Sequence, residues 1–292
     1  MYKIISDSAC DLSKNYIKEH DIAIVPLSVS FDGENYYKDG IDITRNECYE
    51  KMVSDPNLYP KTSLPSVDDY YTTFKEFTDK DIPVVCFTIT LIFSGSYNSA
   101  MNAKELIEEE NPDAKIMVID SKQNTVTQAL IIDQMVRMRD AGIPFEESLK
   151  KLELLMASAR IFFTVGSLDY LQMGGRIGKV ATAASKIDVK PVIIMKDGDI
   201  SLGGIGRNRN KLKKKVLSVA EKYLTENGKE NFIVSVGYGY DKAEGVSFMN
   251  EVEETLGVKL NSETNVAIGI VSAVHTGPYP IGLGVIRKYE TL

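Results

Sequence analysis

Short apolar runs rich in β-branched residues alternate with helix-like segments through the first half of the chain. The runs that predict buried strands are YKIIS at 2–6, IAIVPLSV at 22–29, PVVCFTIT at 83–90 and AKIMVID at 114–120. Between them, Thr44 with Glu47 and Ser66 with Asp69 have the spacing of capping boxes and indicate helix starts. Because strands separated by helices pair in parallel, this half predicts a parallel sheet flanked by helices.

The second half has a different pattern. A long helical region at 125–159, interrupted by Gly142 and Pro144, is followed by a further set of strand-like runs, at 160–167, 190–204, 231–240, 265–274 and 281–289. The pair Asp197-Gly198 is a hairpin signal and predicts an antiparallel component. Helices are expected over 211–226 and 242–256.

These patterns predict an α/β protein of two domains. At 292 residues the chain is long enough for two hydrophobic cores. We expect an N-terminal α/β domain at 1–158, and a C-terminal α/β domain with a mixed or antiparallel sheet at 159–292. We place the boundary near Ser158, before the first strand of the second half.

The net charge argues against a nucleic-acid-binding protein. The chain carries a formal charge of −7 and has an isoelectric point near 5.1, whereas nucleic-acid binding needs a clustered basic field. One basic run, RNRNKLKKK at 207–215, is an exception. It is either a solvated helix face or a docking patch for an acidic partner.

The sequence indicates a protein of a reducing compartment. Cys10, Cys48 and Cys86 are far apart and form no C-x-x-C pair, so neither a disulfide framework nor a zinc site is expected. The N-terminus runs directly into a strand without signal-peptide features. No uncharged apolar run approaches the ~20 residues of a membrane span. We therefore expect a cytoplasmic protein without a transmembrane segment and without a metal site.

Three ends of the expected parallel strands carry hydroxyls or carboxylates: SDSACD at 6–11, LIFSGSYNSA at 91–100 and DSKQNT at 120–125. Ligands gather at the carboxyl ends of parallel strands. Ser94 and Gly95 open a helix, whose N-terminus favours an anion, while Phe93 and its apolar neighbours suit an apolar ligand body. The alternative is that Ser94 only caps the helix.

The stretch SLDYLQMGGRIGKV at 167–180 resembles a phosphate-binding loop but lacks its defining residues. A P-loop needs glycine at Met173 and a magnesium-binding hydroxyl at Val180. A serine-hydrolase elbow around Ser94 would need glycine at Ile92 and Ser96, so that motif is absent too. The sequence therefore gives no sign of a nucleotide site in this chain.

Two other residues are candidates for the same site. His275, expected at the end of the strand at 265–274, precedes a Gly-Pro turn and stands where ligands gather, although a structural role stays open. Thr62 either caps the helix that follows or provides a hydroxyl. Thr62, Ser94 and His275 could together hydrogen-bond one carboxylate, with Arg176 supplying positive charge. Glycines 174 and 175 would allow close backbone approach.

Taken in order along the chain, these motifs resemble the DegV family, the fatty-acid-binding subunits of bacterial fatty acid kinase. The resemblance is carried by IISDSACDLS, KTSLPS, FSGSYNSA, Asp120-Ser121, LDYLQMGGRIGK, the KP and DG of 190–198, GRNRNKL and HTGP. The match extends over nearly the whole chain.

The resemblance implies that one long-chain fatty acid is buried between the two domains. Its carboxylate would be held by residues matching Thr62, Ser94 and His275, beside Phe93 and Gly95. Arginines matching Arg176 and Arg207 would lie near the head group and the kinase docking face. A separate subunit resembling dihydroxyacetone kinases would supply ATP and Mg²⁺ and make an acyl phosphate for phospholipid metabolism, so this chain would need no cofactor and would not catalyse the reaction alone.

The chain departs from the family pattern at several positions. Thr90 and Leu91 stand where serines are usual, Thr127 and Ala129 replace glycines, and Tyr279-Pro280-Ile281 replaces Gly-Ala-Leu. Two other hypotheses remain open: a hydrolase or transferase that uses Ser94 with His275 on acyl substrates, and a regulatory protein that binds a small anion.

Overall fold

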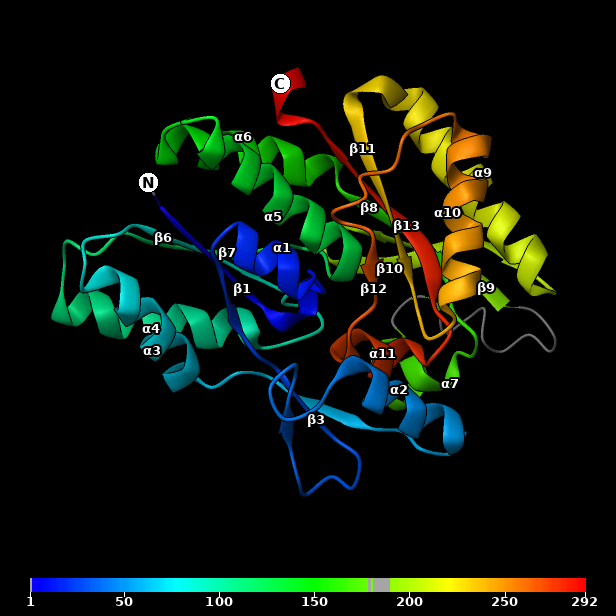
Figure 1. The fold of residues 1–292 in the computed structure, drawn as a ribbon, viewed down its shortest axis with the longest axis horizontal. Coiled ribbons are helices and arrows are strands. Elements are labelled where there is room, and N and C mark those ends of the chain that lie inside the picture. The colour runs from blue at the N-terminus through cyan, green and yellow to red at the C-terminus, as the bar shows by residue number, and fades with distance from the viewer. Residues whose placement is uncertain (1, 178–179, 181–189) are drawn as a thin grey trace.

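The computed structural model describes residues 2–177, 180 and 190–292. Its first half contains a four-stranded parallel sheet in the order β2 (Ile22–Val25), β1 (Lys3–Asp7), β6 (Val84–Thr88) and β7 (Ile116–Asp120). Helices α3 (Val67–Thr78) and α4 (Ser96–Glu110) cover one face of it, and α1 (Lys14–Glu19) and α5 (Thr125–Asp140) lie on the other (Figure 1). The predicted parallel sheet between helices is confirmed.

The second half forms a six-stranded mixed sheet, as predicted. Its strands, in spatial order, are β10 (Asp199–Gly206), β9 (Lys190–Lys196), β8 (Arg160–Thr164), β13 (Ile281–Arg287), β11 (Phe232–Tyr238) and β12 (Val266–Ala267). Neighbours pair antiparallel except β11 with β12. Asp197 and Gly198 both have positive φ, 51° and 86°, which is the backbone of the hairpin turn expected there.

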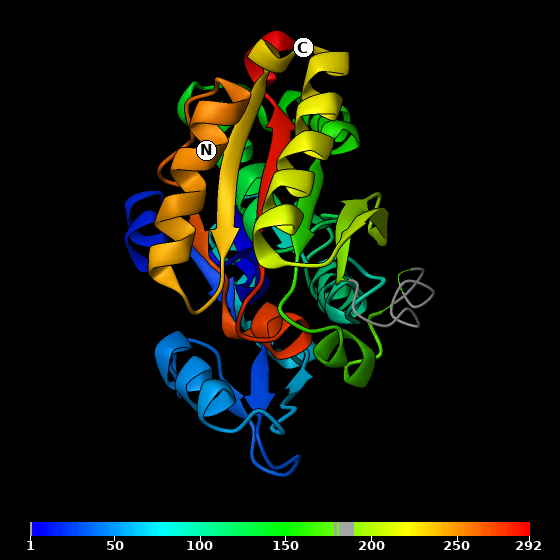
Figure 2. The ribbon, with the colours of Figure 1, turned by 90° about the vertical axis from the view of Figure 1, so that its right-hand side faces the viewer.

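A layer of helices separates the two sheets. Helices α5 and α6 (Phe145–Ser158) contact strand β13, and α5 also contacts β1 and the 3-10 turn η1 (Ser8–Cys10). Helices α9 (Arg209–Asn227) and α10 (Lys242–Leu256) cover the opposite face of the second sheet (Figure 2). The domain boundary near Ser158 stays a prediction; in the structure α6 ends there and β8 begins at Arg160.

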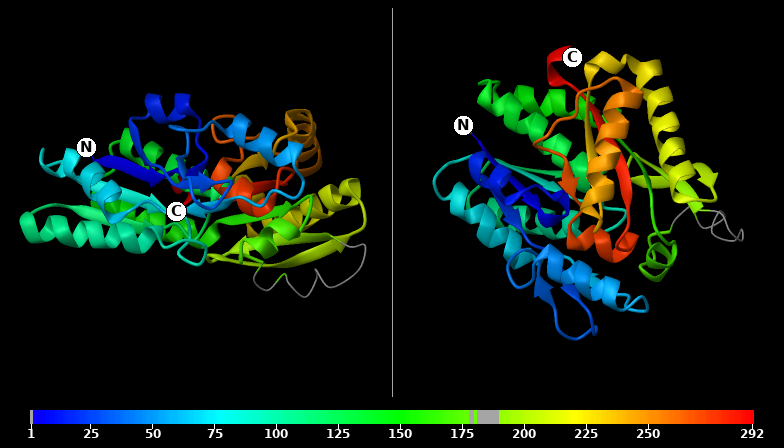
Figure 3. Two further views of the ribbon diagram at one scale, coloured as in Figure 1. Left: turned by 90° about the horizontal axis from the view of Figure 1, so that it is seen from below. Right: turned by 45° about the vertical axis from the view of Figure 1, so that its right-hand side comes forward.

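A small third unit projects from the end of the molecule where the parallel strands finish (Figure 3). It contains a three-stranded antiparallel sheet in the order β4 (Tyr37–Lys38), β3 (Ser28–Ser30) and β5 (Lys61–Ser63), and the helix α2 (Arg45–Ser54). Helix α7 (Asp169–Met173) lies close by. Two further 3-10 turns, η3 (Lys229–Asn231) and η4 (Tyr289–Thr291), complete the described elements.

Two predicted strands were wrong in part. The run at 22–29 divides at Pro26 into β2 and β3, which belong to different sheets, because proline cannot donate to a strand ladder. The run at 265–274 gives only β12 and then becomes helix α11 (Ile270–Thr276), which carries His275 in its last turn. Neighbours α2, α7, β3 and η1 all contact α11, and its run of 7 residues is too short for periodicity to distinguish a buried helix from a strand.

Other local predictions were correct. Both capping boxes, Thr44 with Glu47 and Ser66 with Asp69, are present. Helices α5 and α6 are separated at Gly142, whose φ is +76°, as the break at Gly142 and Pro144 indicated. Within the described residues, no helix has both the length and the apolar character needed to cross a bilayer.

Asp7, at the end of β1, links the parallel sheet by hydrogen bonds to helix α5 and to the segment that follows β6. Its carboxylate is fully buried, accepting the Ile89 amide at 2.7 Å and Gln128 Nε2 at 2.9 Å. Burial raises the pKa of Asp7 from 3.8 to about 6, against the effect of these hydrogen bonds. The folded state therefore holds this proton more tightly than the unfolded state does, and stability from this group is lost as the pH rises through 6.

Replacing Asp7 by Asn should raise the free energy of unfolding at pH 7.5, on the order of 1 kcal/mol or more, because a buried charge is removed. Asn can still accept the Ile89 amide, and Gln128 Oε1, which lacks a partner, can turn to accept from it. Urea unfolding at pH 4 and pH 7.5 measures the effect, which should be much smaller at pH 4.

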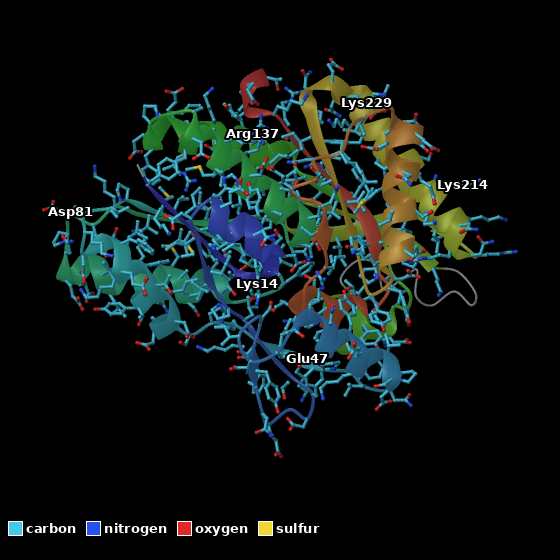
Figure 4. The ribbon with its side chains drawn as sticks, viewed as in Figure 1. Lys14, Glu47, Asp81, Arg137, Lys214 and Lys229 are labelled. Carbon is cyan, nitrogen blue, oxygen red and sulfur yellow. The ribbon has the colours of Figure 1, made fainter. Side chains whose placement is uncertain are left out.

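The matched control is Asp81→Asn, since Asp81 lies exposed in the loop before β6 (Figure 4). A stability difference between Asp7→Asn and the parent protein that is the same at both pH values would show that Asp7 does not change protonation on folding.

Candidate functional site

A cavity of about 400 Å³ lies beyond the carboxyl end of the parallel sheet, between the two halves of the chain. The first half of the chain contributes Leu27, residues 62–64, residue 89, residues 91–95 and Asn124 to the cavity wall. The second half contributes residues of strands β8, β9 and β10, of helix α11 and of the region around α7. The lining residues of the second half are Phe163, Leu171, Arg176, Met195, Ile200, Val271, Ser272, His275 and Thr276. The volume of the cavity is within the usual range for ligand sites, roughly 300–1,000 Å³.

Thr62 and His275 form a hydrogen-bonded pair in the wall of the cavity. Thr62 Oγ1 lies 2.9 Å from His275 Nε2. Thr62 is held in β5 by pairing opposite Val29 of β3, and α11 contacts both strands. The small third sheet therefore positions Thr62, and the helix that replaces the predicted strand positions His275.

The imidazole of His275 is packed tightly. Its Nδ1 lies against Gly174, at a place where a side-chain carbon on residue 174 would overlap it, and Nδ1 has no hydrogen-bond partner. Burial, with a smaller effect from the charge of Arg176, lowers the pKa of His275 from 6.5 to about 4. His275 is therefore neutral at pH 7 and can donate from one ring nitrogen while it accepts at the other.

Ser94 and Gly95 stand at the start of α4. The Ser94 hydroxyl lies 2.9 Å from the Ser96 hydroxyl and accepts the Ser96 amide at 3.2 Å. Gly95 is the N-cap of the 15-residue helix α4 and has no capping side chain. The first amides of a helix lack intrahelical acceptors and favour an anion. No hydrogen bond joins Ser94 to His275, although both are described residues.

Arg176 follows the Gly174-Gly175 pair and lies half-buried at the cavity wall. Its Nη2 donates to the Phe93 carbonyl at 2.9 Å, its Nε donates to the same carbonyl at 3.3 Å, and its Nη1 donates to the Gly174 carbonyl. Thr90 adds a second link between the halves, since its hydroxyl donates to the Gly198 carbonyl at 3.1 Å.

Most of the remaining wall is apolar. Buried side chains from both halves line it, namely Leu27, Ile89, Leu171, Met195, Ile200 and Val271. Leu64, Leu91 and Ile92 also line it and are exposed, with about half of the surface of Leu91 and Ile92 open to solvent (52% and 53%). The cavity thus combines a cluster of hydrogen-bonding groups with an apolar body.

All of the residues predicted to bind the ligand line this one cavity: Thr62, Phe93, Ser94, Gly95, Arg176 and His275. Arg207 does not. It is exposed beside a separate hollow that also contains Lys190 and the segment 165–168. Gly178 and Lys179 of the stretch at 167–180 lie outside the described residues.

Four polar residues of the wall are not among the predicted site residues: Ser63, Asn124, Ser272 and Thr276. Ser272 Oγ is buried without a hydrogen-bond partner. Ser272 and Thr276 are one helical turn apart and share a face with His275, so a helical assignment of 270–276 would have indicated them.

The SDSACD segment packs behind residues that line the cavity. None of its side chains lines the cavity. Ala9 packs against Leu27, Ile89 and Val271, which do, and Ser8 Oγ accepts the Leu27 amide at 3.1 Å. Ala9 and Ser8 therefore help to hold the cavity walls in place.

The chain is similar to known proteins along nearly its whole length. A family model described as "Uncharacterised protein, DegV family" matches residues 1–288. A DegV domain-containing protein of Clostridium acetobutylicum is 29% identical over 287 residues, which cover 98% of each chain.

Solved structures extend the comparison. A stearic-acid-binding protein from Eubacterium ventriosum is 75% identical, with a TM-score of 0.98 over 100% of both chains. A fatty-acid-binding DegV family protein from Thermus thermophilus is 24% identical, covers 98% of this chain and 99% of its own, and has a TM-score of 0.88, which shows the shared fold.

Gly174→Ala should destabilise the protein by about 1–3 kcal/mol, because the added carbon must displace the His275 ring. The backbone of Gly174, at φ −76° and ψ −8°, accepts any residue, so strain of the main chain does not contribute. In a His275→Ala background the same change should cost much less, since the Tyr170 carbonyl oxygen, 3.1 Å from the added carbon, replaces the ring nitrogen at 2.2 Å as its nearest neighbour.

Gly237→Ala is the control for this cycle, because its added carbon would have ordinary 3.6 Å contacts. Urea unfolding of the single and double variants measures the coupling. Equal costs of Gly174→Ala with and without His275 would contradict the packing described here.

Proposed function

The chain belongs to the DegV family, and we propose that it binds one long-chain fatty acid in the cavity between its halves. The observation that carries the proposal is the composition of the cavity wall, which has a cluster of hydrogen-bonding groups and an extended apolar surface. The 75% identity to the stearic-acid-binding protein supports the same ligand class.

We propose that the carboxylate lies among Thr62, Ser94 and His275. A carboxylate removed from water must be hydrogen-bonded. The hydroxyls of Thr62 and Ser94 can donate to it. The single N–H of the neutral His275 ring, placed at Nε2, donates to Thr62 Oγ1 and leaves the Thr62 hydroxyl proton free for the carboxylate. The N-terminus of α4 at Gly95 adds a favourable electrostatic field.

The acyl tail would lie along the apolar wall, in contact with Phe93 and with side chains of both halves such as Ile89 and Met195. Each buried methylene contributes roughly 0.8 kcal/mol. Affinity would therefore come mainly from the tail, and orientation from the polar cluster. A small water-soluble anion would leave this apolar wall unoccupied.

The geometry supports binding without turnover by this chain alone. A Ser94–His275 hydrolase would need the serine within hydrogen-bonding reach of the histidine, but Ser94 is bonded to Ser96 and His275 to Thr62. In addition, a pKa near 4 makes His275 a weak base at neutral pH.

We further propose that a separate ATP-dependent kinase subunit, similar to dihydroxyacetone kinases, phosphorylates the bound carboxylate to an acyl phosphate in the bacterial cytoplasm. ATP and Mg²⁺ would belong to that partner, because this chain has no P-loop sequence. Phosphoryl transfer depends mainly on positioning and on neutralisation of charge. Exposed Arg207, beside Lys190, is the proposed contact for the partner or the phosphate.

Gentle purification followed by organic extraction and mass spectrometry should yield close to one long-chain fatty acid per chain. Thr62→Val and Ser94→Ala should each weaken binding of stearic acid by about 10- to 100-fold, since each removes a hydrogen bond to a charged group. Calorimetric titration into delipidated protein measures this. Thr72→Val, on the exposed side of α3, is the control. Absence of lipid, or ester hydrolysis by the isolated chain that depends on Ser94, would refute the proposal.

Arg207→Ala should lower phosphorylation of the bound fatty acid by the partner kinase while leaving its dissociation constant unchanged, because Arg207 lies outside the cavity. The comparison variant is Lys214→Ala, an exposed residue of α9, the helix that begins two residues after Arg207 (Figure 4). Equal loss of binding and phosphorylation in Arg207→Ala would contradict the assignment.

A further inference from the structure

The guanidinium of Arg176 is directed at main-chain carbonyls. Three of the five N–H groups of an arginine are used here: two on the Phe93 carbonyl, at 2.9 and 3.3 Å, and one on the Gly174 carbonyl. The side chain is half-buried, and burial lowers its pKa. No carboxylate side chain is among its hydrogen-bond or ion-pair partners in the described part of the chain.

The two carbonyls belong to the two sides of the proposed head-group site. Phe93 directly precedes Ser94, in the loop between β6 and α4. Gly174 packs directly against Nδ1 of His275, whose Nε2 is bonded to Thr62. A single planar side chain thus connects the segment that carries Ser94 to the segment against which His275 rests.

Arginine suits this task better than lysine does. Its guanidinium is rigid and planar and holds several donors in fixed directions, whereas a lysine ammonium is a flexible point charge. A role as the charge partner of a carboxylate would make a different demand, since lysine could supply the positive charge as well.

We infer that Arg176 is a positioning residue, which sets the separation between Ser94 and the Thr62–His275 pair through the carbonyls of Phe93 and Gly174. This inference rests on the proposed function, because its effect is measured through fatty-acid binding. It assigns the affinity contribution of Arg176 to geometry and not to attraction between its charge and the carboxylate.

Arg176→Lys and Arg176→Met separate the two roles when each is titrated with stearic acid and with stearamide, its neutral isostere. If Arg176 is a positioning residue, both variants should lose affinity on the order of tenfold for both ligands, and the loss should not depend on salt concentration. If its charge attracts the carboxylate, lysine should retain affinity for the acid, and methionine should weaken the acid but not the amide. That second pattern would overturn the inference.

Stearic acid labelled with ¹³C at the carboxyl group gives a readout that simple destabilisation would not change. We expect its bound NMR signal to move in both Arg176 variants, because the donors no longer converge on the carboxylate. A signal at the parent position, with affinity lost only in proportion to unfolded protein, would overturn the inference. Unfolding in urea measures that fraction.

Arg287→Met is the matched control, since Arg287 Nη2 also donates to a main-chain carbonyl, that of Asn227 at 3.1 Å, outside the cavity. It should leave both affinities unchanged. The proposed function fails separately, if the parent protein does not bind stearic acid at all.

Discussion

Burial of helix α5 between two sheets is the constraint on which the rest of the structure depends. From Thr125 to Val136 every residue of this helix is buried, including Gln128 and Asp133, and its neighbours belong to both halves of the chain. Its buried polar side chains have hydrogen-bond partners on neighbouring elements: Gln128 donates to Asp7, and Asp133 accepts from Tyr16. The two sheets therefore share one core across α5 and α6. Their relative placement is fixed by packing of the hydrophobic interior, and this placement creates the space between their loops.

The cavity follows from this arrangement. The carboxyl ends of the parallel strands face α11 and the β9–β10 hairpin, so each wall has residues from distant parts of the sequence. Three hydrogen bonds join the two halves of the chain around the cavity: Thr62 with His275, Thr90 with the Gly198 carbonyl, and Arg176 with the Phe93 carbonyl. Because His275 is neutral in this surrounding, it offers hydrogen bonding but no positive charge to the proposed carboxylate.

Much of the fold and most of the candidate site could be predicted from local signals. Alternating apolar runs and capping boxes gave the parallel sheet, and the Asp197-Gly198 turn gave the antiparallel component. The predicted binding residues line one cavity. They could be found from the sequence because each stands in a motif of recognisable type. Ser272 and Thr276 were missed because α11 is a run of 7 residues whose pattern also fits a strand, and only a helix brings them onto one face with His275. The sequence indicates Arg176 as a source of positive charge. Only the structure shows that its guanidinium donates to the carbonyls of Phe93 and Gly174.

By itself, the sequence determined the class of the fold, part of the polar cavity wall (Thr62, Ser94, Arg176 and His275) and the absence of nucleotide-binding motifs from this chain, because these depend on residue type and short spacing. Tertiary structure alone decided that His275 stands on a helix, that its partner is Thr62 and not Ser94, and that SDSACD lies under the cavity. These pairings join residues up to 213 positions apart. Such contacts are set by the packing of the two sheets around α5, which no local pattern encodes.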